Sequence, residues 1–415
     1  MNRRLTKVVA LVLAGVLLVG SAGLAGCGED EGEKGPEIVI GVLTDFTGPA
    51  CFAVKPTIDA FMDAFKLAEE KGEFGEATIK FITYDQRTDY SRTKPGYIWL
   101  KGQGAVMMSI ISPTDRSILA EDFGSDEMPV IGSSLEEGSP AHPWAFSGYG
   151  SNGHEFEAIL QWIMETWDYG TDANPKDPPK IGHQGWVLAS TIFYQDGIDR
   201  MLDWYPDKFD FVSLEKAPMG TATWAGEIGK LKESDYIFFS TVGSMTSTFI
   251  KEARDRGYTG AFISGTNSFP GFWDGVTAVM PADELYDCYF AGWMPWWDAD
   301  IDFIDGARES IETYHGGDAS RLRSSGPLSG WQMGVFGVDA LKRAIEAVGA
   351  ENVDGPAIRD AFLATNLTVE GFGEAWQFRE GYHGLLREMK MFKWNQTGED
   401  WEDTGDPWIT PRSLQ

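Results

Sequence analysis

Short apolar runs alternate with stretches of helical periodicity along the first part of this chain. Residues 38–43 read Ile-Val-Ile-Gly-Val-Leu, a nearly continuous apolar run that is typical of a strand covered on both faces. Between residues 55 and 71 apolar side chains recur at helical spacing, and Gly72 follows as a helix stop. We expect further strands at 78–84, 105–111 and 129–131, with helices at 94–102 and 116–123. Such alternation predicts a parallel sheet with crossover helices, whose ligands bind beyond the carboxyl ends of the strands.

A second series of the same kind begins after Gly148. A helix is expected at 154–167, and a polar loop follows it. The later segments are expected as strands at 181–187, 209–214, 236–240, 261–264 and 286–293, helices at 224–231, 246–256 and 329–348, and late strands within 385–394. The pattern therefore predicts two α/β units, and a mature chain of about 390 residues has ample length for them.

The amino-terminal segment has the features of an export signal. Three basic residues within the first seven precede an apolar run at 8–18, which is shorter than the roughly 20 residues that span a bilayer. The following Leu-Ala-Gly-Cys resembles the lipobox of bacterial lipoproteins, which implies cleavage before Cys27 and lipid attachment to its thiol. An ordinary secretory signal is the alternative interpretation. Residues 28–36 are mostly Gly, Glu and Asp, so we interpret them as an acidic tether.

Charge and cysteine usage narrow the range of partners. The chain has 34 basic and 63 acidic side chains, a formal net charge of −29. Such a surface repels nucleic acid and anionic lipid head groups, so we expect no nucleic-acid partner. Cys51 and Cys288 are 237 positions apart and fall in different predicted units, so we do not expect a disulfide between them.

No motif in the sequence indicates an enzyme. The five histidines are scattered, and His-Glu-x-x-His, Cys-x-x-Cys and Gly-x-Ser-x-Gly patterns do not occur. Residues 148–153 match the dinucleotide pattern Gly-x-Gly-x-x-Gly, but only a short run precedes them and a polar loop follows the next helix. We therefore predict a non-enzymatic protein without metal or cofactor, although carboxylate pairs suited to glycoside chemistry stay open in so acidic a chain.

Several segments, in their order and spacing, resemble one known family. They lie at 38–50, 82–85, 129–134, 193–197 and 252–257. Together they are similar to the type I periplasmic binding proteins of ABC transporters, in the leucine/isoleucine/valine-binding branch. The resemblance implies an α/β fold of two Rossmann-like lobes with parallel sheets, joined by a three-stranded hinge and closing on a small ligand.

The resemblance also implies domain boundaries. We expect a signal peptide at 1–26, a tether at 27–36, a first lobe from 37–148 and 293–370, and a second lobe from 149–292 and 371–415. The three crossings would lie near Gly148, Gly292 and Gly371, since glycine can absorb the change in φ and ψ at a hinge.

Polar residues at the predicted strand ends of the first lobe form one half of the expected site. Hydroxyls and amides there could satisfy a buried acid group, which needs several donors. By the resemblance, these loops hold the carboxylate and amine of the ligand, although each could also be an ordinary turn. The candidates are Ser112, Thr114, Asp115, Ser133 and Ser134, with Thr114 and Ser134 first, and Phe52 is a further candidate as an aromatic residue that could line the cleft.

In the second lobe Tyr194 falls where the family has an aromatic residue that closes over the ligand. Thr266 and Asn267 follow a strand end where amino-acid binders of this family usually carry a carboxylate, and no acid is present here. An ammonium without a counter-charge is costly to bury, so either Asp115 or Glu136 supplies the charge from the first lobe or the ligand is an organic acid, an amide or an aromatic compound. Trp293 begins a tryptophan cluster that could line the cleft or simply pack the lobes.

We therefore predict a lipid-anchored, extracytoplasmic solute-binding protein. It would capture a small ligand, which is a branched-chain or other amino acid, an amide, or an aromatic or organic acid, by hinge closure and deliver it to an ABC permease. We expect a monomer. The alternative is a ligand-sensing module for a signalling partner, and an exported hydrolase ranks third.

Overall fold

The structure is a computed structural model that describes most of the chain after the predicted tether. The described residues are 35–135, 142–171, 173–187, 189–218, 220–242, 244–272, 276–277, 279–281, 284–318, 320–379 and 381–415. The predicted signal peptide, Cys27 and the candidate Glu136 lie outside the described residues.

The first lobe is built on a five-stranded parallel sheet with the order β2-β1-β3-β4-β5. Its strands are β1 (Glu37–Thr44), β2 (Thr78–Asp85), β3 (Met107–Ile110), β4 (Val130–Leu135) and β5 (Ala145–Ser151). The buried apolar runs of β1, β3 and β4 match the strands that the sequence predicts. The strand β5 is longer than the short run we expected, and Gly148 and Gly150 lie inside it rather than in a glycine-rich turn.

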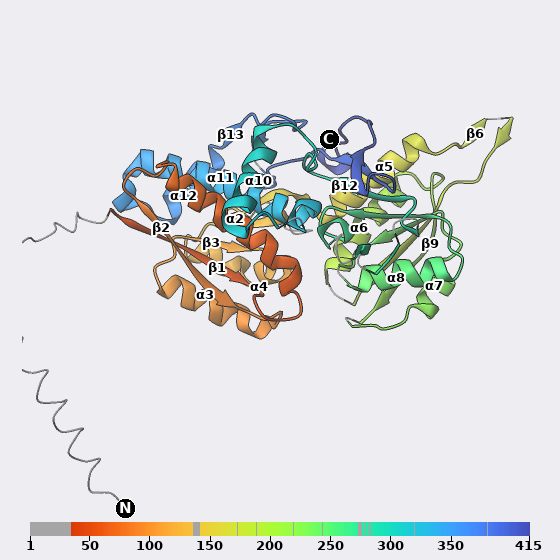
Figure 1. Ribbon diagram of the computed structural model, residues 1–415, viewed down its shortest axis with the longest axis horizontal. Helices are drawn as coiled ribbons and strands as arrows, with labels where there is room; N and C mark the ends of the chain where they lie inside the picture. The colour runs from red at the N-terminus through yellow and green to blue at the C-terminus, as the bar shows by residue number, and fades with distance from the viewer. Residues whose placement is uncertain are drawn as a thin grey trace, which may run out of the picture. The chain divides into compact units, whose positions relative to one another are not determined.

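Helices cover both faces of this sheet (Figure 1), so the lobe has a core on each side. One side carries α3 (Thr93–Gly102) and α4 (Pro113–Ser125), and the other carries α2 (Cys51–Glu70), α11 (Ser325–Val348) and α12 (Gly355–Leu363). The helix α10 (Asp302–His315) packs on α2 and α11. The α2 and α11 axes approach closely because Gly330 has no side chain: a Cβ there would lie 1.9 Å from the Thr57 carbonyl oxygen.

The second lobe is built on a seven-stranded sheet with the order β16-β15-β12-β11-β10-β8-β9. Its parallel strands are β8 (Lys180–Trp186), β9 (Asp210–Ala217), β10 (Tyr236–Phe239), β11 (Ala261–Gly265) and β12 (Cys288–Gly292). Two antiparallel strands, β15 (Lys390–Asn395) and β16 (Asp400–Asp403), extend the β12 edge. Helices α5 (Asn152–Thr166) and α6 (Ala189–Trp204) lie on one face, and α7 (Ala225–Leu231) and α8 (Ser244–Asp255) on the other (Figure 1).

These two sheets confirm the predicted fold class. The sequence did not predict α6, α10 or α12, and α2 and α4 each begin a few residues before the predicted helix. The remaining described elements are short: β6 (Gly170–Thr171), β7 (Asn174–Pro175), β13 (Asn366–Leu367), β14 (Trp376–Gln377) and the 3-10 turns η1 (Tyr90–Arg92), η2 (Phe269–Phe272), η4 (Arg321–Arg323), η5 (Ala350–Asn352) and η6 (Arg412–Leu414).

Candidate functional site

A cavity of about 230 Å³ lies at strand ends of both lobes. Its walls include hydroxyl, amide and apolar side chains from the ends of β3, β4, β10 and β11 and from α2, α4, α6 and α11. The structure brings six of the predicted site residues together on these walls: Ser112, Thr114, Ser133, Ser134, Tyr194 and Asn267.

The first-lobe wall is ordered by the start of α4. Ser112 is the N-cap residue, and its hydroxyl accepts a hydrogen bond from the Asp115 amide (3.2 Å). Pro113 occupies the first turn, where its missing N–H costs nothing. Thr114 follows on the cavity side, so the positive end of the α4 dipole lies at this wall. An acid or carbonyl oxygen of a ligand is favoured there.

Asp115 does not line the cavity. Its carboxylate is fully buried in the first lobe, where it accepts hydrogen bonds from Gln86 Nε2 (3.1 Å) and from the Thr93 hydroxyl. Burial raises the pKa of this carboxyl above its ordinary value. Asp115 therefore ties α3 to α4 instead of offering a counter-charge to a bound ammonium.

A buried arginine supports the end of β4 and links it to β5. Arg116 is 2% exposed and donates to the Ser147 hydroxyl (2.8 Å) and to the Ser134 carbonyl oxygen. Gly132 makes room for the guanidinium, because a side chain at that position would overlap it. Sequence reasoning missed this role, since an arginine beside an acidic residue on a helix is usually solvent-exposed.

Tyr194 and Asn267 form part of the second-lobe wall. Tyr194 lies on α6 with its ring centroid 4.6 Å from that of Phe156. Asn267 follows β11, and its amide nitrogen donates to the hydroxyl of Tyr149. These contacts restrict the conformations of both side chains before a ligand binds. The side chains therefore lose less conformational entropy on ligand binding.

Behind this wall lies Glu155, a fully buried residue in the first turn of α5. Its Oε1 accepts hydrogen bonds from Trp293 Nε1 (2.8 Å) and from the Thr266 amide (3.1 Å). Burial raises the pKa of Glu155 to about 7, although these hydrogen bonds oppose the shift. Trp293 also stacks on Tyr149, with centroids 5.5 Å apart.

Thr266 and Trp293 are thus fully buried around Glu155 and do not line the cavity. Sequence reasoning missed Glu155. The available signal was an acid directly before Phe156, near the start of a segment rich in apolar residues.

A buried histidine supports the same wall from the sheet. His183 Nδ1 lies 2.8 Å from Gln195 Oε1, and Nε2 lies 2.9 Å from the hydroxyl of Ser240, a cavity residue. Burial lowers the pKa of His183 to about 4. The side chain is therefore neutral at physiological pH.

A second cavity of about 210 Å³ adjoins the first, because Ala50, Trp186 and Val242 line both. Its other lining residues are Pro49, Phe52, Gly220 and Met245, so its walls are apolar. Trp186 Nε1 donates to Met245 Sδ (2.8 Å), which satisfies the indole N–H within the wall. We call this space the apolar annex. Phe52, which is 50% exposed, is thus placed in the annex rather than in the polar cavity.

Neither cavity has a charged side chain among its described lining residues. An ion bound in these cavities would therefore rely on hydroxyls, amides and the α4 dipole alone.

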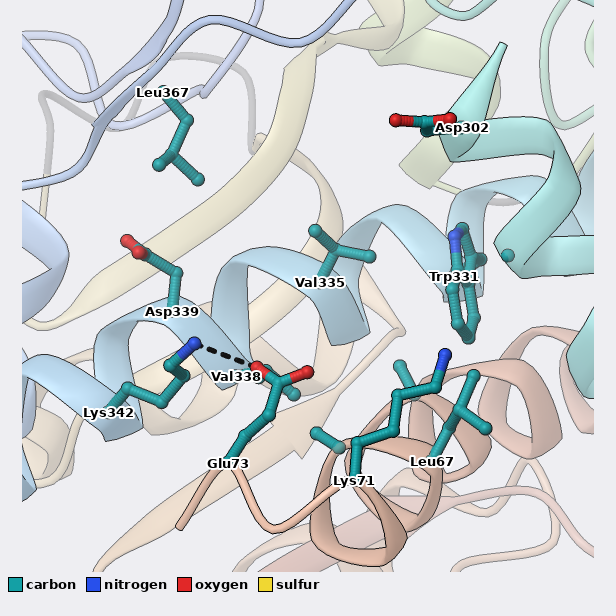
Figure 2. Close-up of a pocket in the computed structure, with 13 residues that line it drawn as sticks. Leu67, Lys71, Glu73, Asp302, Trp331, Val335, Val338, Asp339, Lys342 and Leu367 are labelled. Atoms are coloured by element: carbon teal, nitrogen blue, oxygen red, sulfur yellow. Dashed lines mark hydrogen bonds and ion pairs between the residues drawn. The ribbon is translucent and has the colours of Figure 1, made fainter. Parts of the chain in front are cut away.

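A third hollow of about 330 Å³ lies within the first lobe, between α2, α10 and α11. Its floor is apolar, and its rim is charged. Figure 2 shows Lys342 on the rim reaching Glu73, with Nζ and Oε2 2.7 Å apart. None of the predicted site residues lines this hollow.

Within the described residues, three further features bear on the sequence predictions. Cys51 and Cys288 are both free thiols. No cluster of three or more His, Cys, Asp or Glu side chains in the described ranges is arranged to hold a metal ion. In the same ranges, no helix has the length and apolar character needed to cross a membrane.

Comparisons with known proteins identify the fold and the family. A family model described as periplasmic binding protein matches residues 37–399. A search of curated proteins gives no significant match. The structure is similar to that of a branched chain amino acid ABC transporter protein from Thermus thermophilus with bound valine, with 14% identity and a TM-score of 0.79 over 91% of this chain and 97% of that chain.

Two further solved structures are similar. A fatty acid ABC transporter substrate-binding protein from Thermomonospora curvata has 16% identity and a TM-score of 0.75, covering 91% of this chain and 93% of that chain. A possible leucine/isoleucine/valine-binding protein from Rhodopirellula baltica has 13% identity and a TM-score of 0.74, covering 90% and 97%. At these identities the similarities show the fold.

Proposed function

Because the chain belongs to the periplasmic binding protein family, we propose that it is the lipid-anchored, extracytoplasmic substrate-binding component of an ABC importer. The observation that carries the proposal is the uncharged cavity with walls from both lobes. A ligand that contacts both walls binds best when the lobes are closed on it, so binding shifts the population toward the closed form. The permease would recognise that form.

The ligand is an organic acid or an amide with an apolar tail, rather than a zwitterionic α-amino acid. An ammonium in these cavities would be desolvated without a carboxylate partner from the described lining residues, at a cost of several kcal/mol. A carboxylate or amide oxygen instead finds Thr114, Ser134 and the start of α4. The related proteins named above include one with bound valine and one named for fatty acid, so this fold takes acids of both kinds.

The tail of the ligand occupies the apolar annex. Burying one methylene group contributes about 0.8 kcal/mol, which is about a fourfold gain in affinity. Affinity for a series of straight-chain acids should therefore rise by about this factor per carbon until the annex is filled, and then stop rising.

Calorimetry with L-leucine, hexanoate, hexanamide and phenylacetate tests the ligand class. We expect hexanoate or hexanamide to bind at least tenfold more tightly than L-leucine. Preferred binding of L-leucine would refute the ligand class, and binding of none of the four would refute the proposed tail and head chemistry together.

The double variant Tyr194→Ala, Thr114→Ala tests the site. It should abolish binding of the panel compound that the wild-type protein binds best, while the far-ultraviolet circular dichroism stays unchanged. The matched control is Tyr169→Ala, Thr171→Ala, which changes the same residue types around the β6–β7 turn away from the cavities. Unchanged affinity in the Tyr194 and Thr114 variant would place the ligand elsewhere.

The lipid anchor is tested separately by Cys27→Ser in cells. The variant protein should leave the membrane fraction, and it should be recovered as a monomer. Retention in the membrane fraction would refute the anchor without affecting the ligand-binding proposal.

A further inference from the structure

We propose that Glu155 is a positioning residue of the ligand site, whose carboxylate holds Tyr194 and the loop after β11 in place so that ligand affinity depends on its charge. The inference rests on the proposed ligand-binding function. It adds a buried side chain that touches no ligand but contacts the residues that do.

Glu155 is enclosed by two segments that are far apart in the sequence. Its Oε1 accepts from the Thr266 amide, directly before the cavity residue Asn267, and from Trp293, directly after β12. Its Oε2 occupies the space beside Gly265, where a Cβ would lie only 1.7 Å away. The carboxylate therefore fixes the end of β11 and the segment after β12 relative to α5.

The same carboxylate faces the cavity wall from behind. Burial, and after it the charge of Glu155, raises the pKa of Tyr194, which is 5% exposed and lines the cavity. Burial and the Glu155 charge, in that order, also raise the pKa of Tyr149, which accepts the hydrogen bond of Asn267 and stacks on Trp293. Two of the second-lobe cavity residues thus depend on groups that contact or face Glu155.

Protonation of Glu155 changes the strength of the hydrogen bonds that its carboxylate accepts. The hydrogen bonds from Trp293 and Thr266 are charge-assisted while the carboxylate is ionised, and they weaken when it is protonated. Burial places the pKa of Glu155 at about 7, so the change occurs near neutral pH. Ligand affinity should be highest above about pH 7 and should fall as the pH drops through that value.

The titratable neighbours of Glu155 keep one charge state in this range. On its own helix, burial lowers the pKa of His154 to about 3, so that ring is neutral. Tyr149 on β5 and Tyr194 on α6 have raised pKa values and are also neutral. Arg200 on α6 is always charged and pairs with Glu157.

The end of β11 and the segment after β12 face the carboxylate with Gly265, Thr266 and Trp293, none of which titrates. A pH dependence centred near 7 is therefore assigned to Glu155.

The central experiment compares Glu155→Gln with Glu157→Gln. Both glutamates are fully buried on α5, but Glu157 accepts hydrogen bonds from Arg200 and from the Ser413 amide (3.1 Å), away from the cavity. Hexanoate and hexanamide affinities are measured by calorimetry at pH 6, 7 and 8. Wild type and Glu157→Gln should lose affinity as the pH falls, whereas Glu155→Gln should bind on the order of tenfold more weakly at pH 8 and show no pH dependence.

A ligand-free measurement accompanies it. The near-ultraviolet circular dichroism of the stacked Tyr149–Trp293 pair should titrate with a midpoint near pH 7 in the wild type and stay flat in Glu155→Gln. Trp293→Phe retains the carboxylate but removes one donor to it, so the midpoint of the affinity profile should move to higher pH. If Glu155→Gln fails to fold, the midpoint of the affinity profile of Trp293→Phe tests the inference instead.

The inference is overturned if Glu155→Gln keeps the wild-type affinity or pH profile, or if the midpoint does not move in Trp293→Phe. Failure of the proposed function looks different, because neither hexanoate nor hexanamide would then bind the wild-type protein. In that case the pH titration of the near-ultraviolet circular dichroism, which needs no ligand, tests the role of Glu155. A wild-type signal that does not change with pH would overturn the inference.

Discussion

Acid should destabilise the second lobe through His183, and the size of the effect follows from its surroundings. The imidazole is fully buried between Gln195 and Ser240, and its pKa is lowered to about 4 from an ordinary value of 6.5. The unfolded chain therefore binds a proton at this residue at a higher pH than the native protein does. The stability that neutral His183 contributes is present above about pH 6.5 and is lost as the pH falls toward 4.

Its magnitude comes from the difference in pKa. A gap of about 2.5 units corresponds to about 3 kcal/mol in total, of which about 2 kcal/mol is lost by pH 5. The pKa of buried His154 is also lowered, to about 3, so its contribution to stability is lost over the same pH range and further down, and the wild-type curve alone does not isolate His183.

The assay is urea unfolding of the wild type and His183→Gln at pH 7, 6 and 5. The glutamine amide keeps a polar group near Ser240 but does not titrate, so its stability relative to wild type should improve by about 2 kcal/mol between pH 7 and pH 5. A difference between the two proteins that is the same at all three pH values would refute the reasoning. It would mean that the native protein accommodates a charged imidazole there.

Three further predictions test packing, thiol chemistry and the annex. Gly330→Ala should destabilise the protein by about 1–3 kcal/mol in thermal unfolding, because a Cβ there meets a carbonyl oxygen of α2 at 1.9 Å. Gly226→Ala on α7, where nothing lies within 4 Å, should be neutral or slightly stabilising. A thiol reagent should modify Cys51 in the native protein but reach Cys288 only after unfolding, since Cys288 is buried and its pKa is raised to about 12. Val242→Phe, at a residue shared by both cavities, should weaken hexanoate binding more than tenfold and remove the dependence on chain length.

Each of these has a result that contradicts it. Equal stability of the two glycine variants would mean that α2 and α11 can separate without cost. Rapid modification of both cysteines would show that the core around Cys288 opens. For the annex, Val348→Phe at the exposed end of α11 is the control, and equal hexanoate affinity in both valine variants would rule the annex out as the tail site.

Much of the site could be predicted because it follows from the strand pattern. Apolar runs mark the parallel strands, and the carboxyl ends of neighbouring parallel strands lie at one edge of a sheet. Ser112 and Asn267 follow such ends and Ser134 lies in the last two residues of β4, and the structure gathers all three around one cavity. This part depends on local periodicity and on a general rule of α/β sheets.

Other side chains could not be placed in this way because their orientation depends on distant partners. Asp115 lies one residue after Thr114, yet it faces Thr93 and Gln86 inside the lobe because the first turn of α4 rotates it inward. For Trp293 the sequence left open whether it lines the cleft or packs the lobes; it donates to Glu155, which is 138 positions away. The protonation states of the side chains behind the cavity wall depend on burial, and burial is known only once the lobes are packed.

The amino-acid sequence alone determined the two α/β units, most of their strands along the chain and the set of polar loops from which a site could be made, because these follow from hydrophobic periodicity and from turns between neighbouring residues. Only the tertiary structure decided which of those side chains face the cavity, and that Glu155, His183 and Arg116 are buried behind its walls. Those outcomes depend on contacts between segments far apart in the chain, where the loss of water around a charged or polar group governs both its orientation and its proton affinity.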